Sequence, residues 1–313
     1  MTNLHQSPQT RSTPTGTFSA GKQYVGRFAP SPTGLLHAGS LVAAMASYLD
    51  ARAHDGRWLV RMEDVDQART VPGAAESILQ TLAAFGMQAD GEIVWQSRRS
   101  AHYAAAFEKL GDQVYPCGCS RREIADSVSQ RAASATMPPP YPGTCRHGMT
   151  PGKTARAWRM RVPDLGQPDE YIRFQDRSCG PVMQHLSQEA GDFVLRRADG
   201  FWAYQLAVVV DDAAQGVTHV VRGMDLLDST PRQIYLQRKL GLPTPRYLHV
   251  GLVRDAHGRK LSKQEGAAGL ESGSVLEQLI IAARVLGLNI TSCDSLAQFW
   301  QEAVPAWATR HFP

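Results

Sequence analysis

Short apolar runs alternate with longer segments of helical periodicity through the first part of the chain. Residues 24–29 and 57–62 (YVGRFA and RWLVRM) each predict a short buried strand. Between them, apolar residues from Ser40 onward recur at helical spacing, and Pro72 opens a second helix that stops near Gly86. Strand, helix, strand and helix of these lengths predict a parallel sheet with right-handed crossovers.

The pattern breaks in the middle of the chain and then returns. Residues 116–189 are rich in Pro, Gly and Arg, and within them residues 127–140 (SVSQRAASATMPPP) predict a flexible loop. We therefore expect an insertion here. Beyond it, a helix is expected at 230–241, with Thr230 as its cap and Pro231 in its first turn. Four further strands are expected at residues 193–197, 206–210, 217–223 and 247–253.

These elements predict a parallel α/β domain that an insertion splits in two. Ligands of such sheets bind beyond the carboxyl ends of the strands, where loops meet helix N-termini. The expected division is a disordered tail at 1–22, the first half of the domain at 23–115, the insertion at 116–189, the second half at 190–265 and C-terminal helices at 266–313.

Composition narrows the class of protein without naming a partner. The 313 residues are 43% hydrophobic and 20% charged, which is ordinary for a globular protein, and the net charge is only +4. That charge neither demands nor excludes a nucleic-acid partner. The polar N-terminal stretch lacks the apolar core of an export signal, and no apolar run is long enough to cross a bilayer. We expect a cytoplasmic protein.

The stretch 26–40 (GRFAPSPTGLLHAGS) joins the first predicted strand to the first predicted helix. Gly34 and Gly39 remove side chains where a ligand could approach the backbone. The N–H groups at a helix N-terminus favour an anion, usually phosphate, and His37 adds a donor beside them. A tight turn before a capped helix would contain the same residues, so this stretch alone leaves both interpretations open.

A second polar stretch, residues 257–266 (HGRKLSKQEG), follows the last predicted strand. Its two ammonium groups, on Lys260 and Lys263, could close over a polyphosphate and neutralise the charge that builds during nucleotidyl transfer. A solvated basic loop is the alternative. The order of the two stretches, with an insertion between them, makes the pair more specific than either stretch alone.

Cysteines supply the third candidate for chemistry. In a reducing compartment, a cluster of thiols indicates a metal more than a disulfide, with ordinary reduced thiols as the alternative. A closed structural zinc site needs four ligands, and coordination chemistry favours His147 as the fourth because imidazole binds zinc more readily than phenol. Cys179 and Cys293 stand alone and are expected to be buried. The cysteines of the predicted insertion are Cys117, Cys119 and Cys145.

Two short motifs carry a family resemblance. HAGS at residues 37–40 resembles the HIGH signature of class I aminoacyl-tRNA synthetases, and KLSKQ at residues 260–264 resembles their KMSKS signature. Four longer stretches resemble the glutamyl/glutaminyl branch: RFAPSPTGLLHAGS, VRMEDVD, FWAYQLAVVVDD and GVTHVVRGMDLL. The resemblance extends from Tyr24 to about Gly266.

After that point the chain departs from the full-length glutamyl enzymes. Those enzymes carry a large anticodon-binding region after the KMSKS loop, for which this sequence leaves no room. In its short C-terminal part and its Cys-x-Cys insertion, the chain resembles the glutamyl-queuosine tRNA(Asp) synthetases. These paralogues attach glutamate to the queuosine base of tRNA(Asp). The implied fold is a Rossmann-like parallel sheet of the class I type, with an inserted zinc-bearing module and a short helical C-terminal extension.

The resemblance implies an ATP-dependent ligase that activates L-glutamate to glutamyl-adenylate and transfers it to tRNA, with Mg²⁺ accompanying ATP. The catalytic residues that it implies are His37, Lys260 and Lys263. The implied ATP-binding residues are His37, Gly39, Ser40 and Lys263. The implied L-glutamate-binding residues are Arg27, Phe28, Ala29, Pro30, Ser31, Glu63, Tyr204 and Arg222.

Within this set we expect each charged group of glutamate to meet its opposite. Arg222 would hold the γ-carboxylate with Arg27 close by, Glu63 would take the ammonium group, and Tyr204 would wall the pocket. The resemblance also implies one structural zinc per chain and a tyrosine ligand in place of the histidine. The implied zinc ligands are Cys117, Cys119, Tyr141 and Cys145.

The expected partners are tRNA(Asp) carrying queuosine, L-glutamate and ATP, without DNA or a membrane, and the chain is expected to be a monomer. One alternative is a truncated glutamyl-tRNA synthetase that charges a 3′ end or another acceptor. Another is a non-catalytic paralogue that binds tRNA or a partner protein. Basic residues of the insertion could follow a tRNA backbone; they are Arg121, Arg122, Arg131, Arg146, Lys153, Arg156, Arg159 and Arg161.

Overall fold

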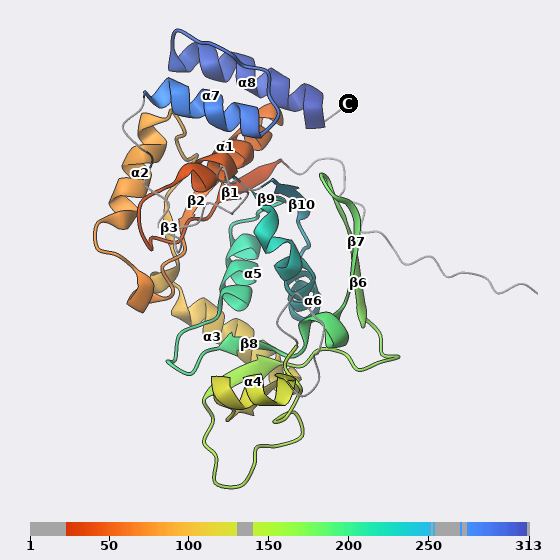
Figure 1. Ribbon diagram of the computed structural model, residues 1–313. Coiled ribbons are helices and arrows are strands. Elements are labelled where there is room, and N and C mark those ends of the chain that lie inside the picture. The colour runs from red at the N-terminus through yellow and green to blue at the C-terminus, as the bar shows by residue number, and fades with distance from the viewer. Residues whose placement is uncertain (1–22, 130–139, 252, 254–269, 271–273, 312–313) are drawn as a thin grey trace, which may run out of the picture.

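The computed structural model describes residues 23–129, 140–251, 253, 270 and 274–311 (Figure 1). The predicted N-terminal tail, most of the predicted loop at 127–140 and the KLSKQ stretch lie outside these residues. Within them, no helix combines the length and the apolar character that crossing a membrane requires.

The first half of the chain forms the expected parallel α/β unit. Strand β1 pairs with β2 in parallel, with Val25 opposite Arg57, and β2 pairs with β3 in the same way. The second helix begins later than predicted, because Gly73 adopts a left-handed conformation (φ 77°) and Pro72 precedes it. The elements are β1 (Val25–Phe28), α1 (Ala38–Ala53), β2 (Arg57–Met62), α2 (Ala74–Ala84) and β3 (Val94–Trp95).

The second half continues this architecture beside β1. A sheet in the order β7-β6-β10-β9 contains the parallel pairs β9–β10 and β10–β6. Its edge lies against β1, where the N–H of Thr218 donates to the carbonyl of Val25 at 2.9 Å. The chain therefore brings the ends of β1, β2, β9 and β10 to one region, although they are far apart in sequence. These strands are β6 (Tyr171–Asp176), β7 (Gly180–His185), β9 (His219–Gly223) and β10 (Arg246–Val250).

The predicted insertion contributes to two different sheets. Its strands β6 and β7 form an antiparallel hairpin whose inner strand pairs with β10. Its strand β5 forms a separate antiparallel sheet with β4, at the start of the insertion, and β8, just beyond it, in the order β4-β5-β8. This sheet lies next to α4 and at the opposite end of the molecule from α7 and α8 (Figure 1). The elements in and around the insertion are α3 (Ser100–Lys109), β4 (Val114–Cys117), α4 (Arg121–Ser129), β5 (Ala157–Met160) and β8 (Phe193–Arg196).

The strand predicted at residues 206–210 is wrong, because this segment lies in helix α5 (Tyr204–Ala214). Its valine run favours a strand by propensity. Residues from Leu206 to Asp212 are nevertheless all buried, so no polar face marks the helical period. Burial between neighbouring elements overrides the local preference here.

Helix α6 (Thr230–Leu240) confirms the prediction at 230–241 except for its cap. Ser229 is the boundary residue, and Thr230 is the first helical residue. The hydroxyl of Thr230 instead accepts a hydrogen bond from Arg222, at 2.7 Å. Gly241 ends the helix in a left-handed conformation (φ 65°), which a glycine adopts without strain.

The expected C-terminal helices are α7 (Val275–Val285) and α8 (Leu296–His311), and the structure shows that both pack against α1. Ser274 and Glu277 form a capping box at the start of α7. The isolated cysteines differ from the expectation of burial: Cys179 is exposed and Cys293 is half-buried.

Asp50 on α1 joins four parts of the fold through one buried carboxylate. Arg177 binds it through two guanidinium nitrogens, at 2.7 and 2.8 Å, and the indole N–H of Trp307 in α8 donates at 2.9 Å. The hydroxyl of Tyr24 is the third donor. Burial alone would raise the pKa of Asp50, but the hydrogen bonds from Arg177 and the other donors lower it overall.

We predict that Asp50→Asn lowers the free energy of unfolding by about 3 kcal/mol, because Arg177 then lacks its counter-charge. Urea unfolding measures this loss. Since the native pKa of Asp50 is lowered, its stabilisation is present above the unfolded pKa of about 3.9 and is lost as the pH falls further. The difference between wild type and variant should therefore shrink in acid. The control is Glu108→Gln at an exposed position of α3; an equal loss in both variants would contradict the assigned role.

Candidate functional site

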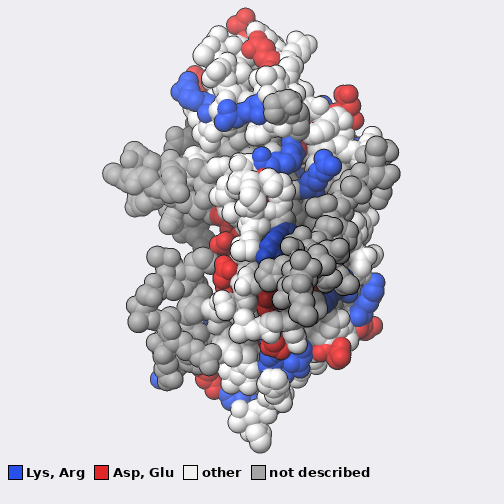
Figure 2. All heavy atoms as spheres, turned by 90° about the vertical axis from the view of Figure 1, so that its right-hand side faces the viewer, with Lys and Arg blue, Asp and Glu red and all other residues white. Residues whose placement is uncertain are grey.

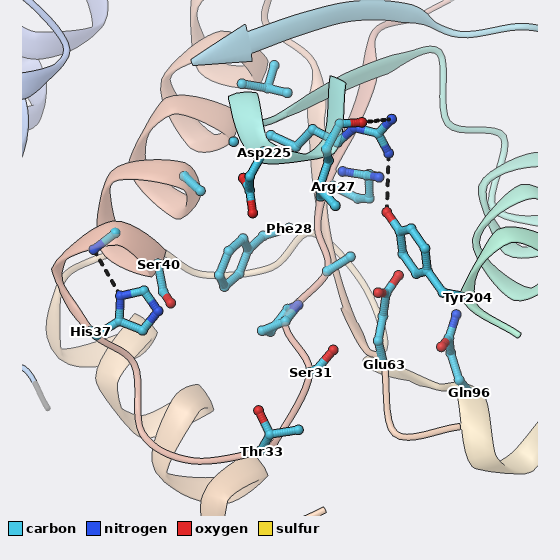
Figure 3. Close-up of a pocket in the computed structure, with 18 of the residues that line it drawn as sticks. Arg27, Phe28, Ser31, Thr33, His37, Ser40, Glu63, Gln96, Tyr204 and Asp225 are labelled. Atoms are coloured by element: carbon cyan, nitrogen blue, oxygen red, sulfur yellow. Dashed lines mark hydrogen bonds between the residues drawn. The ribbon is translucent and has the colours of Figure 1, made fainter. Parts of the chain in front are cut away.

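The ends of the central strands surround a cavity of about 490 Å³. It is lined from β1, β2, β9 and β10 and from the starts of α1 and α5 (Figure 3). Lys260 and Lys263 lie outside the described residues. All the other predicted glutamate- and ATP-binding residues line this one cavity: Arg27, Phe28, Ala29, Pro30, Ser31, His37, Gly39, Ser40, Glu63, Tyr204 and Arg222.

One side of the cavity is formed by the N-terminus of α1. His37 caps this helix, because its Nδ1 accepts a hydrogen bond from the N–H of Gly39 at 3.1 Å. The ring proton of neutral His37 therefore lies on Nε2, which is a hydrogen-bond donor. Figure 3 shows His37 and Ser40 on this side, away from Glu63 and Tyr204. A helix N-terminus with a donor beside it is suited to phosphate.

The opposite side contains a buried guanidinium group with an unusual set of partners. Arg222 is 4% exposed and donates to Thr230 Oγ1 at 2.7 Å, Gln233 Oε1 at 2.9 Å and the Tyr204 hydroxyl at 3.3 Å. These acceptors are neutral, and among the described residues no carboxylate lies within ion-pair distance of Arg222. A buried cation without a counter-charge favours a carboxylate ligand.

Glu63 supplies a negative group to the same cavity. Its side chain is 8% exposed and pairs with Arg61 at 3.1 Å. Burial raises the pKa of Glu63, against the opposing effect of Arg61 and Arg27. Figure 3 shows the Glu63 carboxylate directed toward the Tyr204 ring. An ammonium group bound here would favour the ionised carboxylate.

Arg27 differs from Arg222 because its charge is already balanced. Asp212 on α5 accepts from Arg27 Nε at 3.2 Å and from Arg61 Nη1 at 2.7 Å. Both arginines are buried, and they hold the pKa of Asp212 below its usual value despite burial. Arg27 thus lies beside the cavity as part of an ion-pair network, which makes it a weaker partner for a free carboxylate than Arg222.

Sequence reasoning missed several polar residues of this region. Asp212 and Arg61 do not line the cavity but form a buried ion-pair network with Arg27, which does. The paired acids DD at 211–212 in a buried helix were the available signal. Asp66 at the cavity wall pairs with Arg197 and Arg69. The missed residues that line the cavity also include Thr33, Gln96, Trp202 and Asp225.

The predicted cysteine cluster forms a second candidate centre, near the end of β4. The sulfur atoms of Cys117, Cys119 and Cys145 all lie within 4.8 Å of one another. The Tyr141 hydroxyl lies 3.3 Å from Cys117 Sγ and 3.5 Å from Cys119 Sγ. Ligands at about 2.3 Å in a tetrahedron are separated by roughly 3.8 Å, so this group of atoms is close to the size of a four-ligand metal site.

His147 does not join this group. It is exposed, and no group of potential metal ligands in the described part of the chain contains it. The structure therefore places Tyr141 beside the thiols, whereas His147, which coordination chemistry favours as the fourth ligand, lies outside the group. Burial raises the pKa of the Tyr141 hydroxyl, and the thiols beside it add to this effect. Arg159 lies over its ring at 3.8 Å and a bound cation would also favour the phenolate.

Several basic residues of the predicted tRNA-following band have structural contacts. Arg159 is 8% exposed and donates to the carbonyl of Asp192 at 2.9 Å, and Arg146 pairs with the Asp192 carboxylate. Lys153 pairs with Glu123. Figure 2 shows the Lys and Arg side chains on the hairpin side of the molecule in separate groups among neutral and acidic residues.

Comparison with known proteins agrees with this geometry. Residues 23–280 match the family described as tRNA synthetases class I (E and Q), catalytic domain. The chain is 62% identical over 288 residues to proteins named glutamyl-Q tRNA(Asp) synthetase from Janthinobacterium sp. (strain Marseille) and Verminephrobacter eiseniae (strain EF01-2), covering 92% of this chain and 98% of each relative.

Solved structures extend the likeness to the fold. A glutamate-tRNA synthetase from Elizabethkingia anophelis superposes with a TM-score of 0.72 at 25% identity, covering 90% of this chain and 66% of that one. A glutamate tRNA ligase from Elizabethkingia meningosepticum, in complex with its amino acid, gives the same TM-score and identity over 64% of its chain. The predicted class I parallel α/β fold is confirmed. The chain belongs to the E and Q family of class I tRNA synthetases, and within this family of ligases to the glutamyl-Q tRNA(Asp) synthetases.

Proposed function

We propose that this chain activates L-glutamate with ATP and transfers the glutamyl group to the queuosine base of tRNA(Asp). The observation that carries the proposal is the buried guanidinium of Arg222, which has no carboxylate partner among the described residues, in a cavity that also holds Glu63 and the N-terminus of α1. The names of the relatives supply the acceptor. We also propose that the protein acts in the cytoplasm, where ATP and tRNA are present, and that it acts as a monomer.

In the first step an α-carboxylate oxygen of glutamate attacks the α-phosphorus of ATP, and pyrophosphate leaves. Arg222 holds the γ-carboxylate and Glu63 holds the ammonium group, which leaves the α-carboxylate directed toward the α1 side. His37 Nε2–H and the helix N-terminus at Gly39 and Ser40 stabilise the phosphates. Lys260 and Lys263 are proposed to add positive charge, and Mg²⁺ bound to ATP would neutralise further phosphate charge.

In the second step a hydroxyl of the queuosine base attacks the activated carbonyl carbon. The ester bond forms as the bond between the carbonyl carbon and the phosphate oxygen breaks, AMP leaves with that electron pair, and the hydroxyl proton passes to solvent. The protein's contribution is to position the two reactants and to shield the mixed anhydride from water.

We predict that Arg222→Ala raises the KM for glutamate in ATP–pyrophosphate exchange by about 100-fold or more, because the γ-carboxylate loses its buried cationic partner. Arg222→Lys should recover only part of this loss, since an ammonium group lacks the planar pair of donors. The matched control is Arg238→Ala on α6, which removes an exposed ion pair with Asp169. Near-normal glutamate affinity in Arg222→Ala would refute the pocket assignment.

The acceptor is tested with labelled glutamate and tRNA(Asp) with or without queuosine. We expect labelling only of the queuosine form, and ribonuclease mapping should place the label in the anticodon fragment. Enzymatic removal of the 3′-terminal adenosine should leave this labelling intact. Labelling that needs the terminal adenosine would favour a glutamyl-tRNA synthetase acting on the 3′ end. Absence of both exchange and transfer would favour a non-catalytic paralogue.

We further propose that the cysteine cluster holds one structural zinc ion through Cys117, Cys119, Cys145 and Tyr141. Three thiols and one oxygen at tetrahedral spacing suit zinc, and the cluster is close to the ends of β4 and β5. The ion would fix the fold of this module, which lies apart from the cavity, and would have no part in the chemistry.

Elemental analysis of the purified protein should give one zinc per chain, and Cys119→Ser should lose it. Tyr141→Phe should weaken zinc binding in competition with a chelator, because only three ligands remain. His147→Ala is the control and should bind zinc as the wild type does. Zinc retained fully by Tyr141→Phe but lost by His147→Ala would reverse the choice of ligand.

A further inference from the structure

We propose that Asp176 and His249 are positioning residues that orient Arg222 and balance its charge from behind the cavity. The inference deepens the proposed function and rests on it, because it takes Arg222 as the partner of the γ-carboxylate. Neither Asp176 nor His249 lines the cavity. They act on the substrate only through Arg222.

The register of the sheet creates this arrangement. Arg222 on β9 and His249 on β10 are paired positions of two parallel strands, so their side chains lie on the same face of the sheet. Asp176 ends β6, which pairs with β10 at Tyr247. Three neighbouring strands thus present an arginine, a histidine and an aspartate side by side. The aspartate comes from the hairpin of the predicted insertion, more than 40 residues before Arg222 in sequence.

The hydrogen bonds define one protonation state for the histidine. Arg222 Nε can only donate, and it lies 3.1 Å from His249 Nε2, which must therefore accept. The ring proton then lies on Nδ1, which donates to Asp176 Oδ2 at 2.7 Å. His249 is fully buried and burial lowers its pKa, although the hydrogen bond to Asp176 opposes this shift. A neutral Nδ1–H imidazole satisfies both contacts.

Asp176 is itself held in place as an anion. Its Oδ1 accepts the backbone N–H groups of Ser178 and Cys179, at 2.9 and 3.0 Å. Burial would raise its pKa, but these donors and His249 lower the pKa to about 2. The carboxylate is fully buried and cannot rotate without losing several hydrogen bonds.

The chain of hydrogen bonds from Asp176 through His249 to Arg222, called the relay below, has a consequence for substrate specificity. The Asp176 carboxylate lowers the cost of burying the Arg222 cation. The neutral His249 ring lies between them, so this carboxylate does not bind the guanidinium nitrogens directly. One edge of Arg222, at Nε, is occupied by His249. Its Nη1 atom is directed to Tyr204 at the cavity, the hydrogen bond drawn in Figure 3. A directly paired arginine, like Arg27 with Asp212, would compete with the substrate.

Two isosteric changes at His249 separate the two contacts. In His249→Gln the amide oxygen can replace Nε2 and accept from Arg222, whereas in His249→Asn the amide can reach only Asp176. We expect His249→Asn to raise the KM for glutamate in ATP–pyrophosphate exchange by about tenfold or more, with kcat changed less than about threefold. His249→Gln should recover part of this loss. Asp176→Asn should also raise the KM, because it removes the balancing charge.

The matched control is the buried His185 on β7, which does not contact Arg222. His185→Asn and His185→Gln should leave the KM for glutamate unchanged. Equal losses in both His249 variants with a parallel fall in kcat would show a merely structural role and overturn the relay. A wild-type KM in His249→Asn would overturn it as well. If the wild type shows no glutamate-dependent exchange, the proposed function fails instead.

If the His249 variants do not fold, a measurement on the wild-type protein still tests the proposal. With ¹⁵N-labelled histidine, two-bond nitrogen–proton spectra distinguish the two neutral tautomers and the cation. The relay requires the assigned His249 signal to be the Nδ1–H form at neutral pH. An Nε2–H form or an imidazolium ion would overturn the relay, whatever the kinetics of the enzyme.

Discussion

The site depends on one constraint: the guanidinium of Arg222 is buried, and no carboxylate in the described part of the chain lies beside it. Burying such a charge is costly unless hydrogen bonds and nearby opposite charge compensate for it. Thr230, Gln233 and Tyr204 provide neutral acceptors for Arg222, and the Asp176–His249 pair provides charge at one remove. An acidic substrate compensates the remaining positive charge of Arg222 when it binds. The buried charge that destabilises the folded protein therefore gives the cavity its preference for a carboxylate.

The two halves of the split domain place the Arg222 guanidinium on the side of the cavity opposite the N-terminus of α1 and in the same cavity as Glu63. Glu63 and the N-terminus of α1 come from the first half of the chain, and Arg222 and Tyr204 come from the second half. Contact between β1 and β9, through Thr218 and Val25, joins the halves beside the cavity. Asp212 strengthens the joint, since it is a residue of the second half that pairs with Arg27 and Arg61 of the first. The intervening segment can therefore supply both a strand of the sheet and a separate cysteine cluster.

Sequence predicted the features whose signals are local. The Gly-rich turn between a strand and a helix indicated a phosphate site at His37, and the family resemblance supplied the other site residues. These are Arg27, Glu63, Tyr204, Arg222 and Tyr141. Sequence reasoning failed where partners are distant: Asp212, His249 and Asp176 acquire meaning only from contacts across 27 to 185 residues. The valine run in α5 was mistaken for a strand because burial on all sides erases periodicity.

The most direct test is a crystal structure of the protein with a non-hydrolysable glutamyl-adenylate analogue. The account predicts the γ-carboxylate within hydrogen-bond distance of the terminal nitrogens of Arg222, the ammonium group at Glu63 and the phosphate beside His37. A γ-carboxylate bound to other residues, with Arg222 still surrounded only by its neutral protein acceptors, would contradict it.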